Sequence, residues 1–170
     1  MKFWSIHSYQ RLLIIVGVIV LICGLVWAFV FLSQPGKSWP NQLLPLSATV
    51  STPTGSFDVR VADTAQEQQD GLSGFSNLPP GQGMLFVFPN PDRYAFWMKD
   101  MRFPLDIVWI DDQFQVVDRV VAVSPATFPK NFIPKSPAQY VLEIPANSAD
   151  SAGFVPGVSV KIFAKKLSGQ

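Results

Sequence analysis

The feature that most constrains this chain is an uninterrupted apolar run near its N-terminus. Residues 12–32 contain neither a charged residue nor a proline. As a helix with a rise of roughly 1.5 Å per residue, this run would be about 31 Å long, close to the hydrocarbon thickness of a bilayer. A cleaved signal peptide would have a shorter apolar region followed by small residues, whereas this run ends in Phe31-Leu32-Ser33. The sequence therefore predicts one transmembrane helix over residues 12–32.

The charges beside this run predict its orientation. Lys2 and Arg11 precede the run, and only Lys37 follows it closely. By the positive-inside rule, we expect a single-pass membrane protein with a cytoplasmic N-terminus and its C-terminal domain outside the cytoplasm. The predicted segments are a cytoplasmic tail over residues 1–11, the transmembrane helix over 12–32, a proline-rich tether over 33–46, a β-rich domain over 47–165 and a tail over 166–170.

The residue types that most often bind metals or act as nucleophile and base are confined to the N-terminal part. The one His, His7, and the one Cys, Cys23, both lie there. The rest of the chain therefore cannot form a Cys/His zinc site, a His-containing triad or a disulfide. The net charge is +1 and no basic stripe is present, which argues against a nucleic-acid partner. We expect no cofactor and no metal site.

The predicted domain is rich in proline and in short apolar stretches. All 15 prolines follow the apolar run, and this density disfavours long helices. Thr64 and Glu67 have the spacing of a capping box. The predicted fold class is mainly β (α+β): a single compact β-sandwich or barrel-like domain of about seven strands with two short helices. We expect strands near 57–61, 83–88, 94–98, 105–110, 114–123, 139–144 and 158–163, a hairpin turn at 111–113, and helices near 63–71 and 147–153.

Charged and aromatic residues alternate most densely between Phe96 and Asp106. On a strand, Trp97 and Lys99 would share one face. One interpretation is a core face with a rim held by pairing among Lys, Asp and Arg. The other is a ligand-binding ledge with Trp97 as its platform. The candidate ligand-binding residues are Trp97, Lys99, Asp100, Arg102 and Asp106.

Asp106 is surrounded in sequence by apolar residues and a proline. An ionised carboxylate there needs a partner, because unpaired burial is costly. A structural role would use an ion pair with Lys99, Arg102 or Arg119, or hydrogen bonds to turn amides. The functional alternative is a carboxyl group of perturbed pKa that acts as an acid or base.

Several short motifs follow one another in a fixed order along the predicted domain. In that order they resemble the domain of unknown function 192 family over about residues 46–164. The resemblance implies a compact β-rich domain of bacteria and archaea, often secreted or membrane-anchored, and it implies no established activity. The motifs are Val61-Ala62-Asp63-Thr64, Gly71-Leu72-Ser73, the run 83–88, Phe96-Trp97-Met98-Lys99-Asp100-Met101 with Phe103-Pro104-Leu105-Asp106-Ile107, and Tyr140-Val141-Leu142-Glu143.

The chain departs from the family pattern at three positions. Phe75 stands where many relatives have Arg, and Ala126 stands where some have Cys. A thiol or disulfide role therefore does not apply to this chain. Asn147 stands where Gly is common, and Asn tolerates a positive φ better than most residues.

Two functions of different classes are compatible with these features. The first is a membrane-anchored extracytoplasmic binding or interaction domain without catalytic residues, whose partner is an envelope glycan, a peptide or a protein. The second is a carboxylate-based enzyme that acts on an envelope polymer through Asp100 or Asp106. Two carboxyl groups about 5–10 Å apart across a groove would favour the enzyme, whereas a fully buried and paired Asp106 would favour the binding domain.

Overall fold

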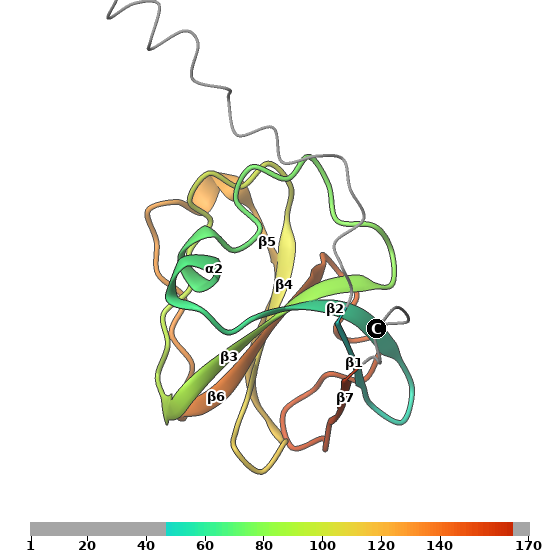
Figure 1. The fold of residues 1–170 in the computed structure, drawn as a ribbon. Coiled ribbons are helices and arrows are strands. Elements are labelled where there is room, and N and C mark those ends of the chain that lie inside the picture. The colour runs from blue at the N-terminus through green and yellow to red at the C-terminus, as the bar shows by residue number, and fades with distance from the viewer. Residues whose placement is uncertain (1–46, 165–170) are drawn as a thin grey trace, which may run out of the picture. The chain divides into compact units, whose positions relative to one another are not determined.

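A single mixed sheet forms the centre of the described part of the chain. The structure is a computed structural model that describes residues 47–164. Seven strands are hydrogen-bonded in the order β5-β4-β6-β3-β2-β1-β7 (Figure 1). The β2–β3 pair is parallel, and the other neighbouring pairs are antiparallel. The strands are β1 Ala48–Ser51, β2 Ser56–Ala62, β3 Gln82–Asp92, β4 Leu105–Ile110, β5 Val116–Val123, β6 Ala138–Pro145 and β7 Lys161–Ala164.

Apolar side chains cover both faces of the sheet, and strand β4, which lies between β5 and β6, is buried along its whole length. Side chains alternate between the two faces along a strand. On one face, Ile107 and Trp109 belong to a cluster that we call the Trp109 core, which also contains Met84, Phe86, Met98 and Val141. On the other face, Val108 and Ile110 belong to the Phe154 core, which also contains Val50, Phe57, Leu142 and Ile144.

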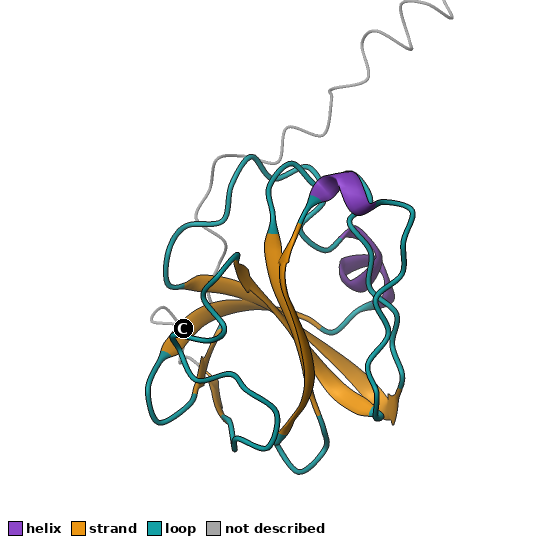
Figure 2. Cartoon of the chain, turned by 180° about the vertical axis from the view of Figure 1, so that it is seen from behind, coloured by secondary structure: helices purple, strands orange, loops and turns teal. Residues whose placement is uncertain are grey.

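The helical content of the described residues is confined to two short segments, α2 (Ala65–Asp70) and the 3-10 helix η1 (Pro125–Thr127) (Figure 2). The predicted capping box of α2 is confirmed: the Thr64 hydroxyl accepts from the Glu67 amide, and the Glu67 carboxylate accepts from the Thr64 amide. The Gln68 side chain then donates to the Val87 carbonyl oxygen at 2.7 Å, which ties α2 to β3.

The prediction of a mainly β domain is confirmed, as are the strands near 57–61, 83–88, 105–110, 114–123 and 139–144 and the hairpin between β4 and β5. The alternation pattern did not identify β1. The predicted last strand is shifted, because Ser159 forms only an isolated bridge with Gln115 before β7 begins. Strand β3 also continues past Pro89, which has no backbone N–H to donate. The register with β6 is irregular between Val87 and Asp92, so no hydrogen bond from Pro89 to β6 is required there.

Two predicted elements are wrong. Residues 94–98 are not a strand, because only Phe96 bridges to Phe132 and its ring packs edge-on against Phe86 and Trp109. Residues 147–153 form turns instead of a helix. Asn147 has a φ of 64° there, as its tolerance of positive φ allows.

The predicted transmembrane helix over residues 12–32 and the tether over 33–46 lie outside the described residues. Within residues 47–164, no helix has the length and apolar character needed to cross a membrane.

Candidate functional site

A cavity of about 180 Å³ lies on the face of the sheet that carries the Trp109 core. Its lining comes from α2, β3 and β6 and from the connecting segments 71–73 and 94–101. Sites that enclose a drug-sized ligand are typically larger, about 300–1,000 Å³. The cavity therefore suits a small molecule or one end of a larger one.

Aromatic side chains form much of the cavity wall. Phe86 and Phe88 lie on the same face of β3 by strand alternation, and both line the cavity. The Phe88 and Tyr94 rings stack with their centroids 3.6 Å apart. The Phe86 and Phe96 rings meet edge-on at 4.9 Å. Trp97 also lines the cavity and is 51% exposed, so the wall opens to solvent on its side.

Glu143 of β6 is the one buried acidic residue that lines this cavity. Only 5% of its surface is exposed, and its Oε2 atom has no hydrogen-bond partner. Its strand neighbours in register are Met84 and Ile107, which are both apolar. The ion pairs within residues 47–164 involve other carboxylates, namely Glu67 with Arg60 and Asp150 with Arg119. Removal from water consequently raises the pKa of Glu143 to about 8.

The sequence analysis did not identify Glu143 as a site residue, although a signal for it was present. Its neighbours Val141, Leu142, Ile144 and Pro145 are all apolar or proline, which is the pattern that drew attention to Asp106. What the pattern does not reveal is whether the carboxyl group finds a partner after folding.

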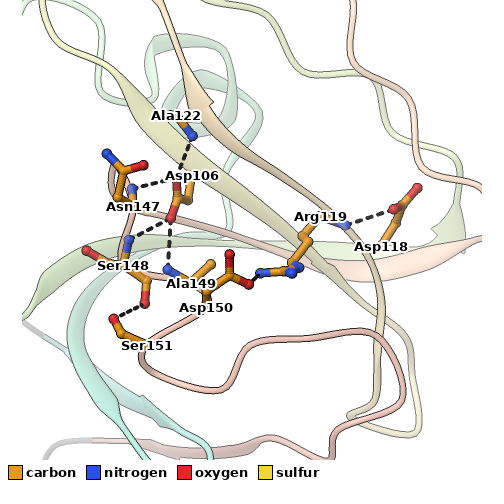
Figure 3. Close-up of polar contacts among 9 residues, drawn as sticks. All are labelled: Asp106, Asp118, Arg119, Ala122, Asn147, Ser148, Ala149, Asp150 and Ser151. Atoms are coloured by element: carbon orange, nitrogen blue, oxygen red, sulfur yellow. Dashed lines mark hydrogen bonds and ion pairs between the residues drawn. The ribbon is translucent and has the colours of Figure 1, made fainter.

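Asp106 is fully buried and fully hydrogen-bonded (Figure 3). Its Oδ1 accepts from the amides of Ala122 at 2.7 Å and Asn147 at 2.9 Å. Its Oδ2 accepts from the amides of Ser148 and Ala149, both at 2.8 Å. The expected basic partner is wrong and the turn-amide alternative is confirmed, since Arg119 pairs with Asp150 instead.

These bonds give Asp106 a structural role. Asn147 has a positive φ and begins a turn whose successive amides donate to the Asp106 carboxylate. Together with the bond from Ala122, these bonds join β4 to the end of β6 and to β5. Antiparallel register places Ile107 opposite Glu143 and Asp106 opposite Ile144. Asp106 and Glu143 therefore lie on opposite faces of the sheet and do not form a carboxylate pair across one groove.

The remaining predicted ligand-binding residues are only partly brought together. Trp97 and Lys99 line the cavity. Asp100 and Arg102 are exposed and are not among the lining residues. Asp100 has a φ of 58°, and it lies between Lys99 and Met101, which both line the cavity. Among residues 47–164, no cluster of three or more His, Cys, Asp or Glu side chains is arranged to hold a metal ion.

Comparison with known proteins identifies the family. Residues 48–162 match DUF192, which is described as an uncharacterized ACR. The chain belongs to the DUF192 family. The family resemblance of the sequence motifs is thus confirmed over the described domain. No curated protein matches the chain.

Two solved structures are similar to this DUF192 chain. One is a protein of unknown function from Novosphingobium aromaticivorans DSM 12444, with 29% identity and a TM-score of 0.62 over 68% of this chain and 83% of the other. The second is a candidate transcription regulator from Sinorhizobium meliloti 1021, with 25% identity and a TM-score of 0.61 over 67% of this chain and 90% of the other.

Proposed function

We propose that this DUF192 protein is a binding module that takes a small ligand, or one end of a larger one, into the cavity at Glu143. The observation that carries the proposal is a buried carboxyl oxygen without a hydrogen-bond partner in an aromatic-lined cavity. Buried polar atoms in proteins almost always have a partner, and a missing partner costs about 1–3 kcal/mol.

The two buried carboxyl groups of the domain make this argument sharper. Asp106 receives four backbone amides, so the fold is able to satisfy a buried carboxylate completely. Glu143 sits on the adjacent strand, and its Oε2 has no partner. A ligand that donates a hydrogen bond inside the cavity would supply it.

The proposed setting is outside the cytoplasm, on a membrane anchor. Its support is the apolar run over residues 12–32 together with the preceding positive charges Lys2 and Arg11. In that setting the ligand would come from an envelope glycan, a peptide or a protein. Trp97, half exposed at the cavity wall, is a suitable platform for a sugar ring or an apolar side chain.

A carboxylate-based enzyme is the second candidate, and one observation favours it. A carboxyl group in a cavity with a pKa near 8 has the protonation state of a general acid at neutral pH. Glu143 would take the role that the sequence suggested for Asp100 or Asp106, because Asp106 already accepts four hydrogen bonds and Asp100 does not line the cavity. Asp70 of α2 is the other carboxylate at the cavity.

Ligand binding by the full 170-residue chain tests the proposal. Fragments of envelope glycans and peptides are screened by the change in tryptophan fluorescence and in the unfolding midpoint, since Trp97 lines the cavity. Ala95→Trp places a large side chain at the cavity lining and should abolish binding. Ala126→Trp makes the same change at an exposed position of η1 and should not.

Binding that is equal in the two variants, or no binding by any fragment, would contradict the proposal. Turnover of a fragment that is lost in Glu143→Gln would favour the enzyme instead.

A further inference from the structure

The chemistry of the cavity narrows the class of ligand, and this step rests on the proposed binding function. We infer that the cavity binds a protonated primary amine, whose ammonium group pairs with the Glu143 carboxylate while its carbon skeleton lies against the aromatic wall. The ligand is thus an amine-bearing side chain or small molecule.

The first argument is the missing partner of Glu143. A buried carboxylate is stable when a cation with hydrogen-bond donors lies beside it. Arg60 and Arg119 form ion pairs with other carboxylates, and Oε2 of Glu143 has no hydrogen-bond donor within residues 47–164. An ammonium group supplies both the charge and the N–H donors. A hydrocarbon would leave Oε2 unpaired, and a carboxylate ligand would add a second negative charge beside it.

The aromatic wall is the second argument. The face of an aromatic ring is electron-rich and attracts a cation within about 6 Å of the ring centre. The rings of Phe86, Phe88, Tyr94 and Phe96 line the same cavity as Glu143. The Phe88–Tyr94 stack and the Phe86–Phe96 edge contact hold these rings in place before a ligand arrives. Rings combined with one carboxyl group favour a cation over a neutral polar ligand.

The other titratable groups at the cavity are compatible with a cation. Asp70 of α2 adds a carboxylate, and Lys99 of the segment 94–101 adds one exposed cation, whose charge solvent screens. Burial, and then the charge of Asp92, raise the pKa of Tyr94, so its phenol is neutral near pH 7. The neighbours of Glu143 on β3 and β4, Met84 and Ile107, carry no charge.

The size of the cavity sets the length of the skeleton. A volume of about 180 Å³ corresponds to roughly six water molecules at about 30 Å³ each. A chain of four or five carbons with a terminal ammonium group fits this space. n-Pentylammonium is therefore the probe, and 1-pentanol is its neutral counterpart of the same shape.

The experiment is calorimetric titration of the full chain with both probes. At pH 8, where Glu143 is about half deprotonated given a pKa of about 8, wild-type protein should bind pentylammonium about tenfold or more tightly than pentanol. Glu143→Gln should remove this preference and leave pentanol binding unchanged. The matched control Glu67→Gln makes the same change in the capping box, at a partly exposed residue that does not line the cavity, and should leave both affinities unchanged.

A second readout needs no variant. Because Glu143 must lose its proton to pair with the ammonium group, pentylammonium affinity should rise from pH 6 to pH 8 by up to about 50-fold, given a pKa of about 8. Pentanol affinity should stay level over the same range.

Each outcome separates the two proposals. If pentanol binds as tightly as pentylammonium and Ala95→Trp abolishes both, the amine class is wrong while the binding function stands. If pentylammonium affinity is independent of pH and unchanged in Glu143→Gln, the inferred pairing is wrong. If neither probe binds the folded protein, the amine inference fails, and the fragment screen then decides the binding function separately.

Discussion

Asp106 offers the most direct test of how this domain is held together. Its carboxylate accepts four backbone amides that come from two places distant in sequence, Ala122 and the turn over residues 147–149 (Figure 3). Asp106→Ala removes both acceptor oxygens and leaves the four N–H donors without their hydrogen bonds. Asp106→Asn keeps one oxygen, which can serve two of these amides, but turns an NH₂ group toward the other two.

The expected magnitudes follow from these bonds. A hydrogen bond to a charged group contributes about 1.5–3 kcal/mol to stability, and its effects are not additive. Part of the loss is offset because a buried charge is no longer desolvated. We expect Asp106→Asn to lower the free energy of unfolding by about 3 kcal/mol and Asp106→Ala by about 4–5 kcal/mol, out of a typical total of about 5–15 kcal/mol. The Asn variant should then unfold about 12 °C or more below wild type.

Urea and thermal unfolding of the full chain, followed by circular dichroism, measure both changes. The matched control is Asp112→Asn, because Asp112 is exposed in the hairpin turn between β4 and β5. That variant should stay within about 0.5 kcal/mol of wild type. If Asp106→Ala costs less than about 1 kcal/mol, the four amides do not stabilise the fold and the structural role of Asp106 is refuted.

Three further predictions concern Glu143 and the parts of the chain. Glu143 holds its proton in the folded state up to pH about 8, against an ordinary pKa of 4.5. Between these two pH values the folded state therefore binds more protons than the unfolded state. The free energy of unfolding, relative to that of Glu143→Gln, should fall by about 1.4 kcal/mol per pH unit as pH rises. If urea unfolding gives the same pH dependence for both proteins, this prediction is wrong. A reporter active only outside the cytoplasm, fused after Gln170, should be active, and activity of a cytoplasmic reporter there would reverse the predicted topology. Residues 46–166 should unfold cooperatively with a chelator and a reductant present; cooperativity seen only without them would show that a metal or an oxidant is needed.

Local patterns in the sequence were sufficient for several features of the domain. The Thr64–Glu67 spacing predicts the start of α2, because a capping box is made within four residues. Alternating and continuous apolar residues predict β2, β4 and β6, because these patterns too are formed by residues close together in sequence. The burial of Asp106 also follows from its neighbours. The segment at 94–98 shows the limit, because aromatic residues favour a strand, yet Phe96 forms a single bridge and its ring packs in the core.

Only the tertiary structure decided what each buried carboxyl group does. Asp106 and Glu143 have similar apolar neighbours in sequence, and their strands β4 and β6 are adjacent. Yet one side chain meets amides from a turn more than 40 positions away, whereas the other faces a cavity built from four separate stretches of the chain. Sequence alone determined that both positions are enclosed by apolar residues, since strand burial is read from nearest neighbours. Whether each carboxyl group finds a hydrogen-bond partner depends on the strand register and on which distant backbone segment packs against that face of the sheet. Long-range packing alone sets both.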